Sequence, residues 1–586
     1  MCGIIGYVGK KNAAKVLIDG LKSLEYRGYD SAGIAVVLEK QIKTIKSIGK
    51  IANLEKEIPD NINSNIGIGH TRWATHGGVT IENCHPHTVG NVTLVHNGII
   101  ENYLKIKEKL TKSGYKFVGE TDSEILCGLI DFYYKEINDK LLTIQKVISE
   151  IEGSYALGII FHDEMDKIYA VRKDSPLIIG LSEEENFIAS DMPAIIKYTN
   201  KYIVLEVGEI AKLDANNVEI YKNDKKIHKD ILLYESQINT VDLMGYRHYM
   251  LKEIFEEPTL IRNNIPKNLD DIPDIKKYNH IYIIGCGSAY HAGMIGKFLI
   301  EEYANKMVSV DIASEFRYRK LFLEKNDLII LISQSGETAD TLASLRIAKK
   351  AGATTLGIVN VYASSIAREA DQVVYTNALT EVAVATTKAY MMQLYYLSLI
   401  ALKATNTKFD KAINDYKKLA SQVDSILDKN IYKKIARKIY KNDDIFFLGR
   451  GIDYASVMEG SLKLKEISYI HSEAYPAGEL KHGTISLVEE GTPVISVITN
   501  NYIKDKTISN IKEVISRGAK SYIICTDDID ISTEYYDEII KVPSNSPLLK
   551  PILIIIPLQL LAYEVARLNG YDIDKPRNLA KSVTVE

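Results

Sequence analysis

The sequence predicts an α+β domain followed by two α/β domains, each built on a parallel sheet. Residues 2–230 contain many short β-rich runs separated by polar turns, with helical stretches at 13–24 and 121–134. This pattern is typical of an α+β domain with much antiparallel sheet. Later in the chain, short apolar runs such as IYIIG and LIILIS alternate with long helical patterns, which indicates βαβ units. A length of 586 residues agrees with about two to four domains.

The second half of the chain contains an internal repeat. The run IYIIG at 281–285 opens GCGSAYHAG, and IFFLG at 445–449 opens GRGIDYASV, so each copy places a G-x-G turn after a strand. Only the first copy carries the Ser-rich run SQSGETADT at 333–341, so we expect that copy to bind the ligand. The predicted segments are a first domain at 2–235, a linker at 236–265, repeat domains at 266–415 and 430–575, and a tail at 576–586.

Composition and charge limit the possible partners. The chain is 46% hydrophobic and 25% charged, and its net charge of −4 predicts no nucleic acid or anionic membrane as a partner. The apolar stretch at 548–566 contains Lys550, Pro551 and Pro557, so we expect a buried helix there and not a membrane span. The start, MCGIIGYVGKKNAAK, does not resemble a signal peptide. The cysteines form no CxxC pair or Cys/His cluster, which predicts no metal site and a reducing, cytoplasmic location.

Cys2 is a candidate nucleophile. Removal of Met1 would leave Cys2 with a free α-amine, whose pKa of roughly 8 allows it to accept the thiol proton near neutral pH. The alternative is an ordinary buried cysteine near the terminus, and Cys2 alone would favour it. The following motifs favour a site instead: EYRGYDSAG at 25–33, GHTRWATHG at 69–77, HNGIIENY at 96–103 and GETDSE at 119–124.

Each of these motifs contains a residue type that an active site can use. Asn97 and Gly98 follow a predicted strand, where an amide side chain and a backbone N–H can form an oxyanion hole. Arg72 offers a bidentate fork for a carboxylate, and Asp122 offers a counter-charge for an ammonium group. Singly, a hairpin turn, a surface ion pair and a helix N-cap are ordinary alternatives for these residues. Their joint occurrence favours a site.

In this order and spacing, the motifs resemble the class II glutamine amidotransferases, which have an N-terminal nucleophile fold with four αββα layers. The resemblance implies that Cys2 attacks glutamine while Asn97 and Gly98 hold the oxyanion. It also implies that Trp73 gates the ammonia passage, although an ordinary core aromatic is the alternative. By the same resemblance, the glutamine-binding residues are Arg72, Trp73, Thr75, His76 and Asp122.

The run SQSGETADT follows an apolar strand, and its hydroxyls and backbone N–H groups at a strand-to-helix turn suit a phosphate. It lacks the G-K-[ST] of a nucleotide-binding P-loop, and a plain βα turn is the alternative. Together with the repeat, it resembles the SIS (sugar isomerase) domain, a flavodoxin-like fold that binds phosphosugars. The resemblance implies that the sugar phosphate contacts Ser288, Ser333, Gln334, Ser335, Thr338, Val384, Lys463 and Ala580.

Glu459, Lys463 and Glu466 are spaced i, i+4 and i+7, which places them on one stripe of a helix. A solvated ladder of ion pairs is the alternative, but the Tyr and His residues that follow up to position 482 favour a site. The resemblance implies that Glu466 moves a proton between sugar C1 and C2. It also implies that His482, from a neighbouring subunit, assists ring opening and that Lys581 forms a Schiff base with the ketose.

The two resemblances cover nearly the whole chain and imply one activity. They imply that L-glutamine and D-fructose 6-phosphate become L-glutamate and D-glucosamine 6-phosphate, the first step of hexosamine (UDP-N-acetylglucosamine) biosynthesis. They imply ammonia channelling, no cofactor and a homodimer formed through the second half. Ala289 and Thr484 depart from the family pattern, where Ser and Pro are expected.

Three alternatives remain beside this interpretation. Amidophosphoribosyltransferases share the Cys2 half, but we find no phosphoribosyl-diphosphate loop with paired acidic residues after a strand. An amidotransferase or deglycase that acts on a different sugar phosphate is not excluded by the sequence. A non-catalytic sugar-phosphate sensor would be compatible with the SIS fold, but the presence of Cys2, Glu466, His482 and Lys581 argues against it.

Overall fold

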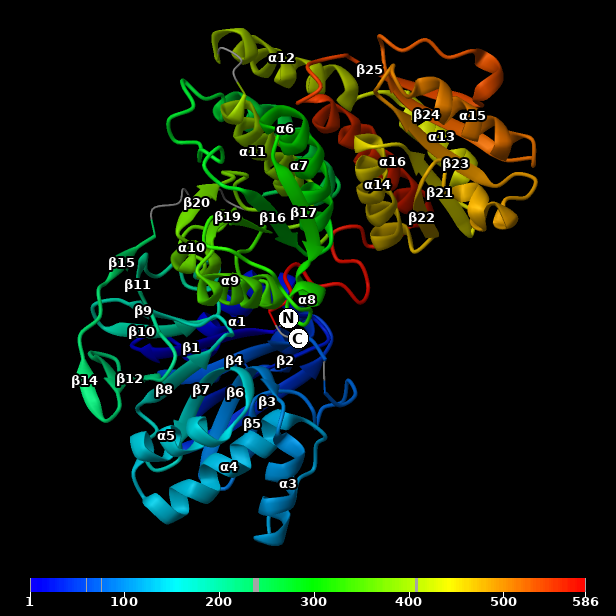
Figure 1. Cartoon of the computed structure of the whole chain (residues 1–586). Coiled ribbons are helices and arrows are strands. Elements are labelled where there is room, and N and C mark those ends of the chain that lie inside the picture. Colours follow the sequence, from blue (N-terminus) through cyan, green and yellow to red (C-terminus); the bar gives the residue numbers. More distant parts are fainter. Residues whose placement is uncertain (1, 60, 75, 235–241, 406–408, 585–586) are drawn as a thin grey trace. The chain divides into compact units, whose positions relative to one another are not determined.

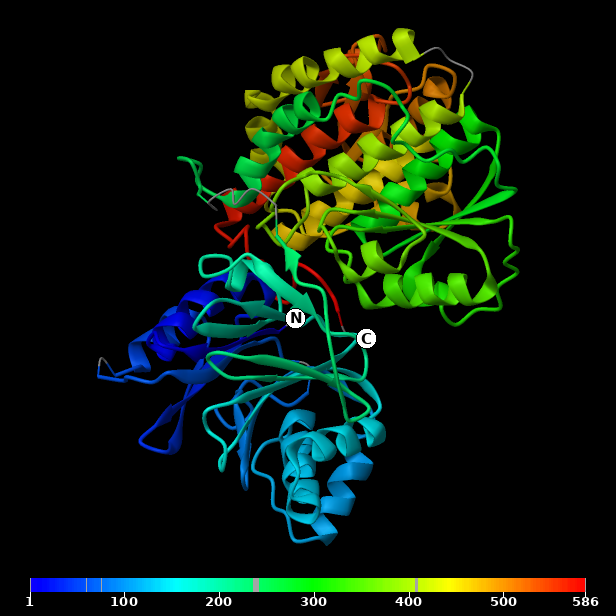
Figure 2. The same ribbon diagram turned by 90° about the vertical axis from the view of Figure 1, so that its left-hand side faces the viewer.

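The computed structural model describes residues 2–59, 61–74, 76–234, 242–405 and 409–584. The chain divides into two compact units, which are Met1–Ile238 with Ser582–Glu586, and Asn239–Lys581 (Figures 1 and 2). We call them unit 1 and unit 2. Most of unit 1 is blue to cyan in Figure 1, and unit 2 runs from green to red.

Two antiparallel sheets form the centre of unit 1. Among the described residues, one sheet has eight strands in the order β15-β11-β9-β10-β1-β4-β2-β3, and the other has seven in the order β14-β13-β12-β8-β7-β6-β5. The strands of the first sheet are β1 (Gly3–Gly9), β2 (Ser31–Leu38), β3 (Gln41–Ile48), β4 (Ile66–Arg72), β9 (Ile178–Leu181), β10 (Glu185–Ala189), β11 (Lys201–Val204) and β15 (Leu232–Leu233). The strands of the second are β5 (His87–Val89), β6 (Val92–Ile100), β7 (Gly153–Phe161), β8 (Ile168–Lys173), β12 (Glu209–Leu213), β13 (Val218–Lys222) and β14 (Lys225–Ile227).

Helices cover the outer faces of both sheets, as Figure 1 shows. One apolar cluster, with Leu17, lies between α1 and the first sheet. A second, with Ile68 and Val95, lies between the sheets, and a third, with Ile130, lies between the second sheet and α4. This layer order confirms the predicted αββα fold, and α1 and α4 confirm the two predicted helices. The helices are α1 (Ala13–Leu24), α2 (Ile51–Glu57), α3 (Tyr103–Lys112), α4 (Asp122–Ile137) and α5 (Lys140–Glu150).

Unit 2 contains two parallel sheets with the same strand pattern. Among the described residues, each has five strands, ordered β17-β16-β18-β19-β20 and β22-β21-β23-β24-β25, so the predicted repeat is confirmed. The first sheet comprises β16 (His280–Gly285), β17 (Met307–Ile312), β18 (Leu328–Ser333), β19 (Thr354–Val359) and β20 (Gln372–Tyr375). The second comprises β21 (Asp444–Gly449), β22 (His471–Pro476), β23 (Pro493–Ile498), β24 (Lys520–Thr526) and β25 (Glu538–Val542).

The helices of unit 2 share one large apolar core that joins both sheets. The apolar helix α16 is long enough to cross a membrane, but 89% of its most apolar window is buried inside the unit, as expected for a core helix. The helices are α6 (Tyr249–Asn263), α7 (Ser288–Ala304), α8 (Ala313–Phe316), α9 (Ala339–Ala351), α10 (Ser365–Glu369), α11 (Lys388–Ala404), α12 (Phe409–Leu427), α13 (Asn430–Ile439), α14 (Ile452–Ser468), α15 (Lys504–Ile515) and α16 (Lys550–Asn569).

Helix α6 lies inside the segment that the sequence analysis treated as a linker. Met250, Ile254 and Ile261 lie on one side of this helix and are fully buried in the core of unit 2. Because charged residues lie between these apolar ones, the composition of the segment did not predict a buried helix. The first helix of the second unit therefore begins at Tyr249, between about four and five turns of helix before the predicted domain start at 266.

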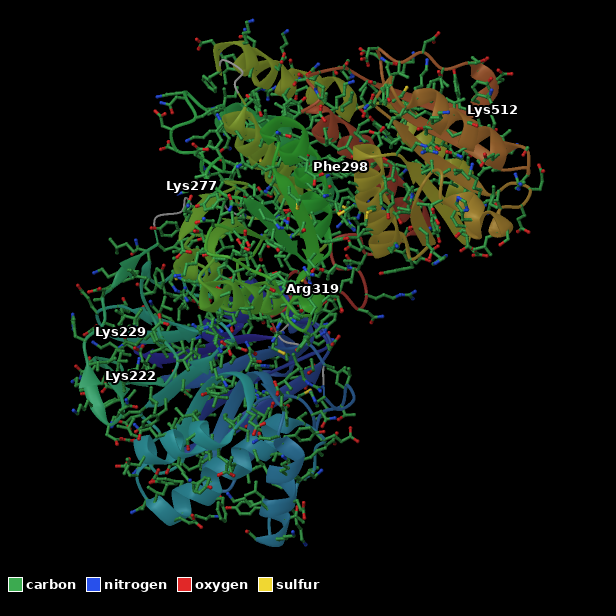
Figure 3. All side chains as sticks on the ribbon, in the orientation of Figure 1. Lys222, Lys229, Lys277, Phe298, Arg319 and Lys512 are labelled. Carbon is green, nitrogen blue, oxygen red and sulfur yellow. The ribbon has the colours of Figure 1, made fainter. Side chains whose placement is uncertain are left out.

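Charged side chains lie on the outside of both units (Figure 3). Lys222 and Lys229 pair with Glu209 at distances of 3.8 Å and 3.0 Å, and Lys512 lies 4.4 Å from the ring centre of Tyr535. The lysines reach the surface, whereas the side chain of Glu209 that they share is only 4% exposed.

Candidate active sites

Cys2 lies directly before β1, where that strand pairs with β4. The register sets Gly3 opposite Thr71, which brings Cys2 next to the end of β4. The backbone N–H of Trp73 donates to Cys2 Sγ over 3.2 Å. Burial raises the pKa of the Cys2 thiol, although the Trp73 N–H and the charges of Arg72 and Arg27 act in the opposite direction. The thiol is therefore protonated until a nearby base accepts its proton.

Asn97 and Gly98 lie near the end of β6, and Asn97 contacts Cys2. Asn97 Nδ2 donates to the carbonyl of Cys2 over 3.0 Å and to Ser190 Oγ over 2.9 Å. Gly98 has a φ of +136°, and a Cβ at this position would lie 2.0 Å from the carbonyl oxygen of Ser154. Only glycine fits such a backbone and such an approach. The motif thus requires both an amide and a glycine beside the thiol.

Arg72 and Asp122 hold backbone groups around this centre. The buried Arg72 guanidinium donates to the carbonyls of His76, Gly77 and Gly78 over 2.6–3.0 Å. Asp122 begins α4 and accepts from the backbone N–H of Ile100 over 2.8 Å. Thr121 is the N-cap of α4, so the N-cap alternative for Asp122 does not apply.

The aromatic members of the predicted glutamine set lie at the same place. The ring of Trp73 meets that of Tyr29 edge to face, with 5.7 Å between their centres. The ring of His76 meets Tyr103 in the same way, at 5.5 Å. Thr75 lies outside the described residues.

Three buried histidines lie around His96, which precedes Asn97 on the same strand. His96 N–H donates to His85 Nδ1 over 3.2 Å, and His70 Nε2 donates to the carbonyl of His96 over 3.0 Å. The rings of His70 and His85 stack with 4.0 Å between centres, and His87 lies against His85. Burial lowers the pKa of His70 to about 3 and keeps the pKa values of His85 and His87 well below their usual range. These imidazoles are therefore neutral at ordinary pH.

The stacked His70 and His85 side chains bind the backbone of His96 on the side where no strand pairs with it. On one side of β6, β7 pairs with His96 through Leu157. On the other side, pairing with β5 stops at His87 and Leu94, so the backbone of His96 has no strand partner there. His70 and His85 satisfy its two polar groups, which a buried backbone requires. They fix the residue before Asn97.

In unit 2, the Ser-rich run forms the turn between β18 and α9. Ser333 Oγ accepts from Gly336 N–H over 3.0 Å and lies 2.9 Å from Thr338 Oγ1. Ser335 Oγ accepts from Glu337 N–H, and the carbonyl of Gln334 accepts from Asn360 N–H. The turn lies at the carboxyl end of a parallel strand and at a helix N-terminus, where anions bind.

The predicted stripe on α14 is buried and not solvated. Lys463 is 1% exposed at its side chain, and its Nζ lies 2.5 Å from Glu466 and 3.4 Å from Glu459. Ser288 at the start of α7 donates to Glu459 over 2.8 Å, and His291 contacts its other oxygen at 2.8 Å. The stripe of the second repeat copy is thus joined to the first copy.

The pKa values of the two carboxyl groups on this stripe, Glu459 and Glu466, are shifted in opposite directions. Burial would raise the pKa of Glu459, but Lys463, His291 and Ser288 outweigh burial and lower it. Burial raises the pKa of Glu466 despite the nearby Lys463. Glu466 is therefore the one whose environment suits a proton-transferring group.

Lys581 lies against the segment that precedes α11. Its Nζ forms an ion pair with the buried Glu381 and donates to the carbonyl of Ala383 over 2.8 Å. Glu381 also accepts from the backbone N–H groups of Thr387 and Ala389. Burial opposes the charge of Glu381, but Lys581 and these hydrogen bonds lower its pKa to about 2. Lys581 thus meets a carboxylate, and Ala580 precedes it in the tail.

Val384 contacts the C-terminal tail, whereas His482 is exposed. The backbone N–H of Val384 donates to the carbonyl of Asp574 over 3.0 Å, which ties the segment before α11 to the C-terminal tail. His482 ends a short 3₁₀ turn, Leu480–His482, and is exposed. Among the described contacts of this chain, none joins His482 to Glu466 or Lys581. The described contacts thus join Ser288 to the Glu459–Glu466 stripe and Lys581 to the segment before Val384, and they do not include His482.

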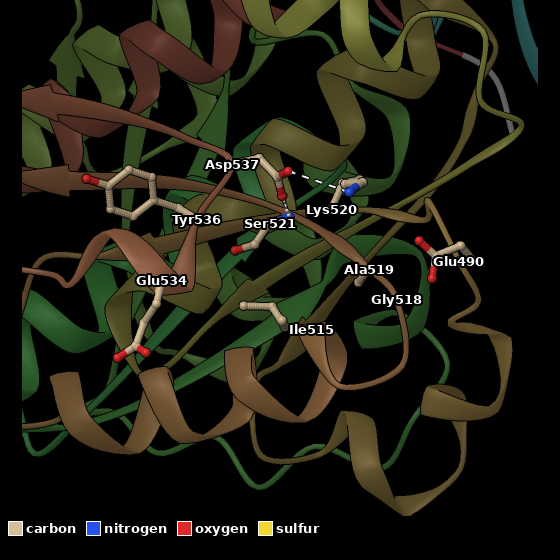
Figure 4. Close-up of a pocket in the computed structure, with 9 residues that line it drawn as sticks. All are labelled: Glu490, Ile515, Gly518, Ala519, Lys520, Ser521, Glu534, Tyr536 and Asp537. Atoms are coloured by element: carbon tan, nitrogen blue, oxygen red, sulfur yellow. Dashed lines mark hydrogen bonds and ion pairs between the residues drawn. The ribbon is translucent and has the colours of Figure 1, made fainter.

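A surface hollow of unit 2 lies away from these residues (Figure 4). Its volume is about 390 Å³, and Gly518, Lys520 and Asp537 are among its lining residues. It opens at the amino end of β24, whereas ligands of parallel sheets bind at the carboxyl ends of the strands. It contains none of the predicted site residues.

Comparison with known proteins agrees with both halves. A glutamine amidotransferase domain model matches residues 82–197, and a SIS domain model matches residues 274–403 and 438–568. The chain is 49% identical to the glutamine–fructose-6-phosphate aminotransferase (isomerizing) of Clostridium tetani, 44% to that of Methanosarcina acetivorans and 42% to that of Thermus thermophilus, and each comparison covers the whole of both chains. The chain belongs to the glutamine–fructose-6-phosphate aminotransferase family.

A solved structure of this aminotransferase family matches unit 2. The C-terminal domain of the glucosamine-fructose-6-phosphate aminotransferase from Francisella tularensis is 38% identical, with a TM-score of 0.55. The match covers 57% of this chain and all of that one.

The sequence analysis missed several residues of both sites in this family member. The most informative are Glu381 beside Lys581, His291 beside Glu459, and the histidine pair that holds His96. The run His85-Pro86-His87 before HNG was a signal for the last of these. Glu381 has no motif around it, and only the fold connects it with Lys581.

Proposed function

We propose that the chain converts L-glutamine and D-fructose 6-phosphate to L-glutamate and D-glucosamine 6-phosphate. The supporting observation is that one chain holds a Cys2–Asn97 centre and, in its other unit, a buried Lys581–Glu381 pair with the Glu459–Glu466 stripe. Full-length relatives with this activity in their names add to that support.

The glutamine half uses Cys2 as the nucleophile. In the mature chain, the α-amine of Cys2 takes the thiol proton, and the thiolate attacks the side-chain amide of glutamine. Asn97 and the Gly98 N–H stabilise the oxyanion, ammonia leaves, and water hydrolyses the thioester to glutamate. Arg72 and Asp122 bind the carboxylate and ammonium groups of glutamine, and Trp73, Thr75 and His76 complete the pocket.

The sugar half uses Lys581 and Glu466. The Ser333–Thr338 turn and Ser288 hold the phosphate and hydroxyls, with Val384, Lys463 and Ala580 beside the sugar. The amine of Lys581 adds to the C2 carbonyl of the open ketose, and the carbonyl oxygen leaves as water. Ammonia then replaces Lys581 at C2. Glu466 takes a proton from C1 and returns it at C2, which yields the aldose.

Three further proposals complete the function. His482 assists ring opening in the site of a second subunit, because its side chain is exposed in its own chain, and this requires a homodimer. The enzyme acts in the cytoplasm. Ammonia passes between the sites along a path closed to solvent, because free ammonia is protonated in water near neutral pH.

A coupled product assay tests the function. The full chain is supplied with glutamine and fructose 6-phosphate, and glutamate and hexosamine 6-phosphate are measured together. We expect equal amounts of both, and glutamate without hexosamine phosphate would contradict the proposal. A faster reaction with a different sugar phosphate would assign the chain to another amidotransferase activity.

The variant Cys2→Ala separates the two halves. We expect glutamine hydrolysis to fall by about 10³-fold or more, because the nucleophile is gone, while isomerisation of fructose 6-phosphate continues. Intact-mass measurement of the wild-type chain should show Cys2 as the first residue. Loss of both reactions in Cys2→Ala would contradict the division into two sites.

A further inference from the structure

Helix α6 buries two carboxyl groups that the proposed mechanism does not use. The side chains of Glu253 and Glu257 are on adjacent turns and are 1% and 0% exposed. Burying a carboxyl group is costly unless hydrogen bonds or charges compensate for it. Their presence in the core of unit 2 therefore requires a reason, and the contacts of Glu253 provide one.

Glu253 holds the backbone segment that holds Lys581. Its Oε1 accepts from the backbone N–H groups of Val382 and Ala383. On either side of these groups, the Glu381 carboxylate and the Ala383 carbonyl both contact Lys581 Nζ. One carboxyl group on α6 thus fixes two consecutive backbone N–H groups, between the two groups that contact the amine.

The same helix also holds the tail that carries Lys581. Asp574 accepts from the N–H groups of Tyr249 and Met250, at 2.8 Å and 2.9 Å, and so caps α6. The carbonyl of Asp574 accepts from Val384 N–H, at the end of the segment that Glu253 holds. The backbone on both sides of the Lys581–Glu381 pair is therefore anchored to the first two turns of α6.

We propose that Glu253 is a positioning residue for Lys581, which it places through Glu381 and Ala383. This inference rests on the proposed function, since it concerns the step in which Lys581 forms an imine with the ketose. No described hydrogen bond or ion pair joins Glu253 to Lys581, so it acts through Val382 and Ala383, from whose N–H groups it accepts hydrogen bonds.

The charges around Glu253 explain why it should be neutral. It faces Glu381 and Lys388 from the segment that leads into α11, and Lys581 from the tail. Burial and the charge of Glu381 raise the pKa of Glu253 to about 8, although the two lysines oppose this. Its Oε2 is buried and has no hydrogen-bond partner among the described residues, so it can carry the proton.

The neutral state matters because only the free amine of Lys581 can attack the ketose. Glu381 already supplies one negative charge beside the ammonium group. A second carboxylate at Glu253 would stabilise the ammonium further and would reduce the fraction of free amine. Imine formation should therefore slow when Glu253 ionises above its raised pKa of about 8.

The test compares Glu253→Ala and Glu253→Gln in the full chain, with Glu257→Ala as a matched control. Glu257 is equally buried on the next turn of α6, so its truncation leaves a similar cavity, but no described hydrogen bond joins it to 381–384. Borohydride reduction traps the imine with fructose 6-phosphate, and mass spectrometry measures it at Lys581. The KM for fructose 6-phosphate, the melting temperature and glutamine hydrolysis are measured on the same samples.

We expect Glu253→Ala to slow trapping by about 10²-fold with KM changed less than about threefold, because the amine is misplaced while the phosphate turn is intact. Glu253→Gln keeps the acceptor oxygen and should restore trapping to within about fivefold of wild type at neutral pH. It should also abolish the slowing above about pH 8. Glu257→Ala should lower the melting temperature but leave trapping within about threefold of wild type.

The outcomes distinguish this inference from the proposed function. If the wild-type chain traps no imine with fructose 6-phosphate, the proposed function fails. If wild type traps it and Glu253→Ala does so equally fast, the inference is overturned. Equal losses in Glu253→Ala and Glu257→Ala would also overturn it, because they would indicate general loss of packing. The same holds if Glu253→Gln is as slow as Glu253→Ala.

Discussion

The two candidate sites bury their polar groups in opposite ways. Around Cys2 in unit 1, neutral imidazoles and amides hold the backbone, because His70 and His85 hydrogen-bond to the strand that carries Asn97. The charged Arg72 and Asp122 side chains there also hydrogen-bond to backbone groups. Around Lys581 in unit 2, they are charged groups that compensate one another, as in the Glu381–Lys581 pair. The first site is held by hydrogen bonds, and the second by ion pairs.

This difference matches the chemistry that each site would perform. Glutamine is zwitterionic, and in the proposed site its charges meet Arg72 and Asp122, with which the neutral imidazoles do not compete. The sugar half must keep lysine and carboxyl side chains close to one another and reactive, which requires paired charge. The two sites should therefore be destabilised by different changes. The charged site, around Lys581, should lose stability when one partner of an ion pair is removed. The neutral site, around Cys2, should lose stability when its histidines are protonated.

The largest expected effect is that of Lys463→Met in the charged site. The change leaves Glu459 and Glu466 buried without their shared cation, and breaking such a pair costs about 3–5 kcal/mol. We expect unit 2 to lose stability by about this amount. Isomerisation of fructose 6-phosphate should fall by about 10²-fold or more, whereas glutamine hydrolysis in unit 1 should persist. Urea unfolding and the two assays on the full chain measure this.

The control for this prediction is Lys465→Met. Lys465 is on the same helix but exposed, so its replacement should alter neither stability nor isomerisation measurably. If Lys463→Met behaved like this control, the stripe would not be an electrostatic unit, and the contrast between the two sites would disappear.

The second effect concerns acid stability of the neutral site. The pKa of His70 is about 3 in the folded chain and about 6.5 when unfolded, so the unfolded chain binds more protons between these values. The stabilisation is complete above the unfolded pKa and is lost as pH falls towards 3. The contribution is up to about 1.4 kcal/mol per pH unit for one histidine.

Fluorescence of Trp73 measures this effect in the full chain, because Trp73 is the single tryptophan and lies in unit 1. Urea unfolding is followed between about pH 5 and 7.5, where only His70 and its neutral neighbours are expected to differ between variants. His70→Gln keeps a donor for the His96 carbonyl and should flatten the pH dependence. The exposed His228→Gln should not, and an equal effect of both variants would refute the buried-histidine explanation.

Local patterns predicted much of this structure. Helix 13–24 matched α1 because its apolar residues recur at helical spacing, and the i, i+4, i+7 spacing put Glu459, Lys463 and Glu466 on one stripe. The αββα layers and the two SIS sheets were predicted from strand patterns together with the family resemblance. These features depend on neighbours in sequence or on motifs longer than one residue.

Contacts across long sequence distances were not predictable. Glu253 and Val382 are 129 positions apart, and Glu381 and Lys581 are 200 apart, so neither pair has a local pattern. The neutrality of His70 depends on burial, which spacing does not report. The exposed His482 makes no described contact with Glu466 or Lys581, and its role in a second subunit stays a prediction.

The smallest expected effect is a change in the KM for glutamine that depends on the position of Asp122 and not on helix stability alone. Thr121 caps α4 next to Asp122, and Asp139 caps α5 in the same way, by accepting from Leu142 N–H over 2.9 Å. Replacing either residue by Ala should cost about 1 kcal/mol in unfolding of unit 1. Only Thr121→Ala should raise the KM for glutamine, by about twofold to fivefold, because only its helix begins at Asp122. Equal KM values in the two variants would mean that Asp122 is positioned by Ile100 N–H and not by its helix, and the neutral site would then be fixed from β6 alone.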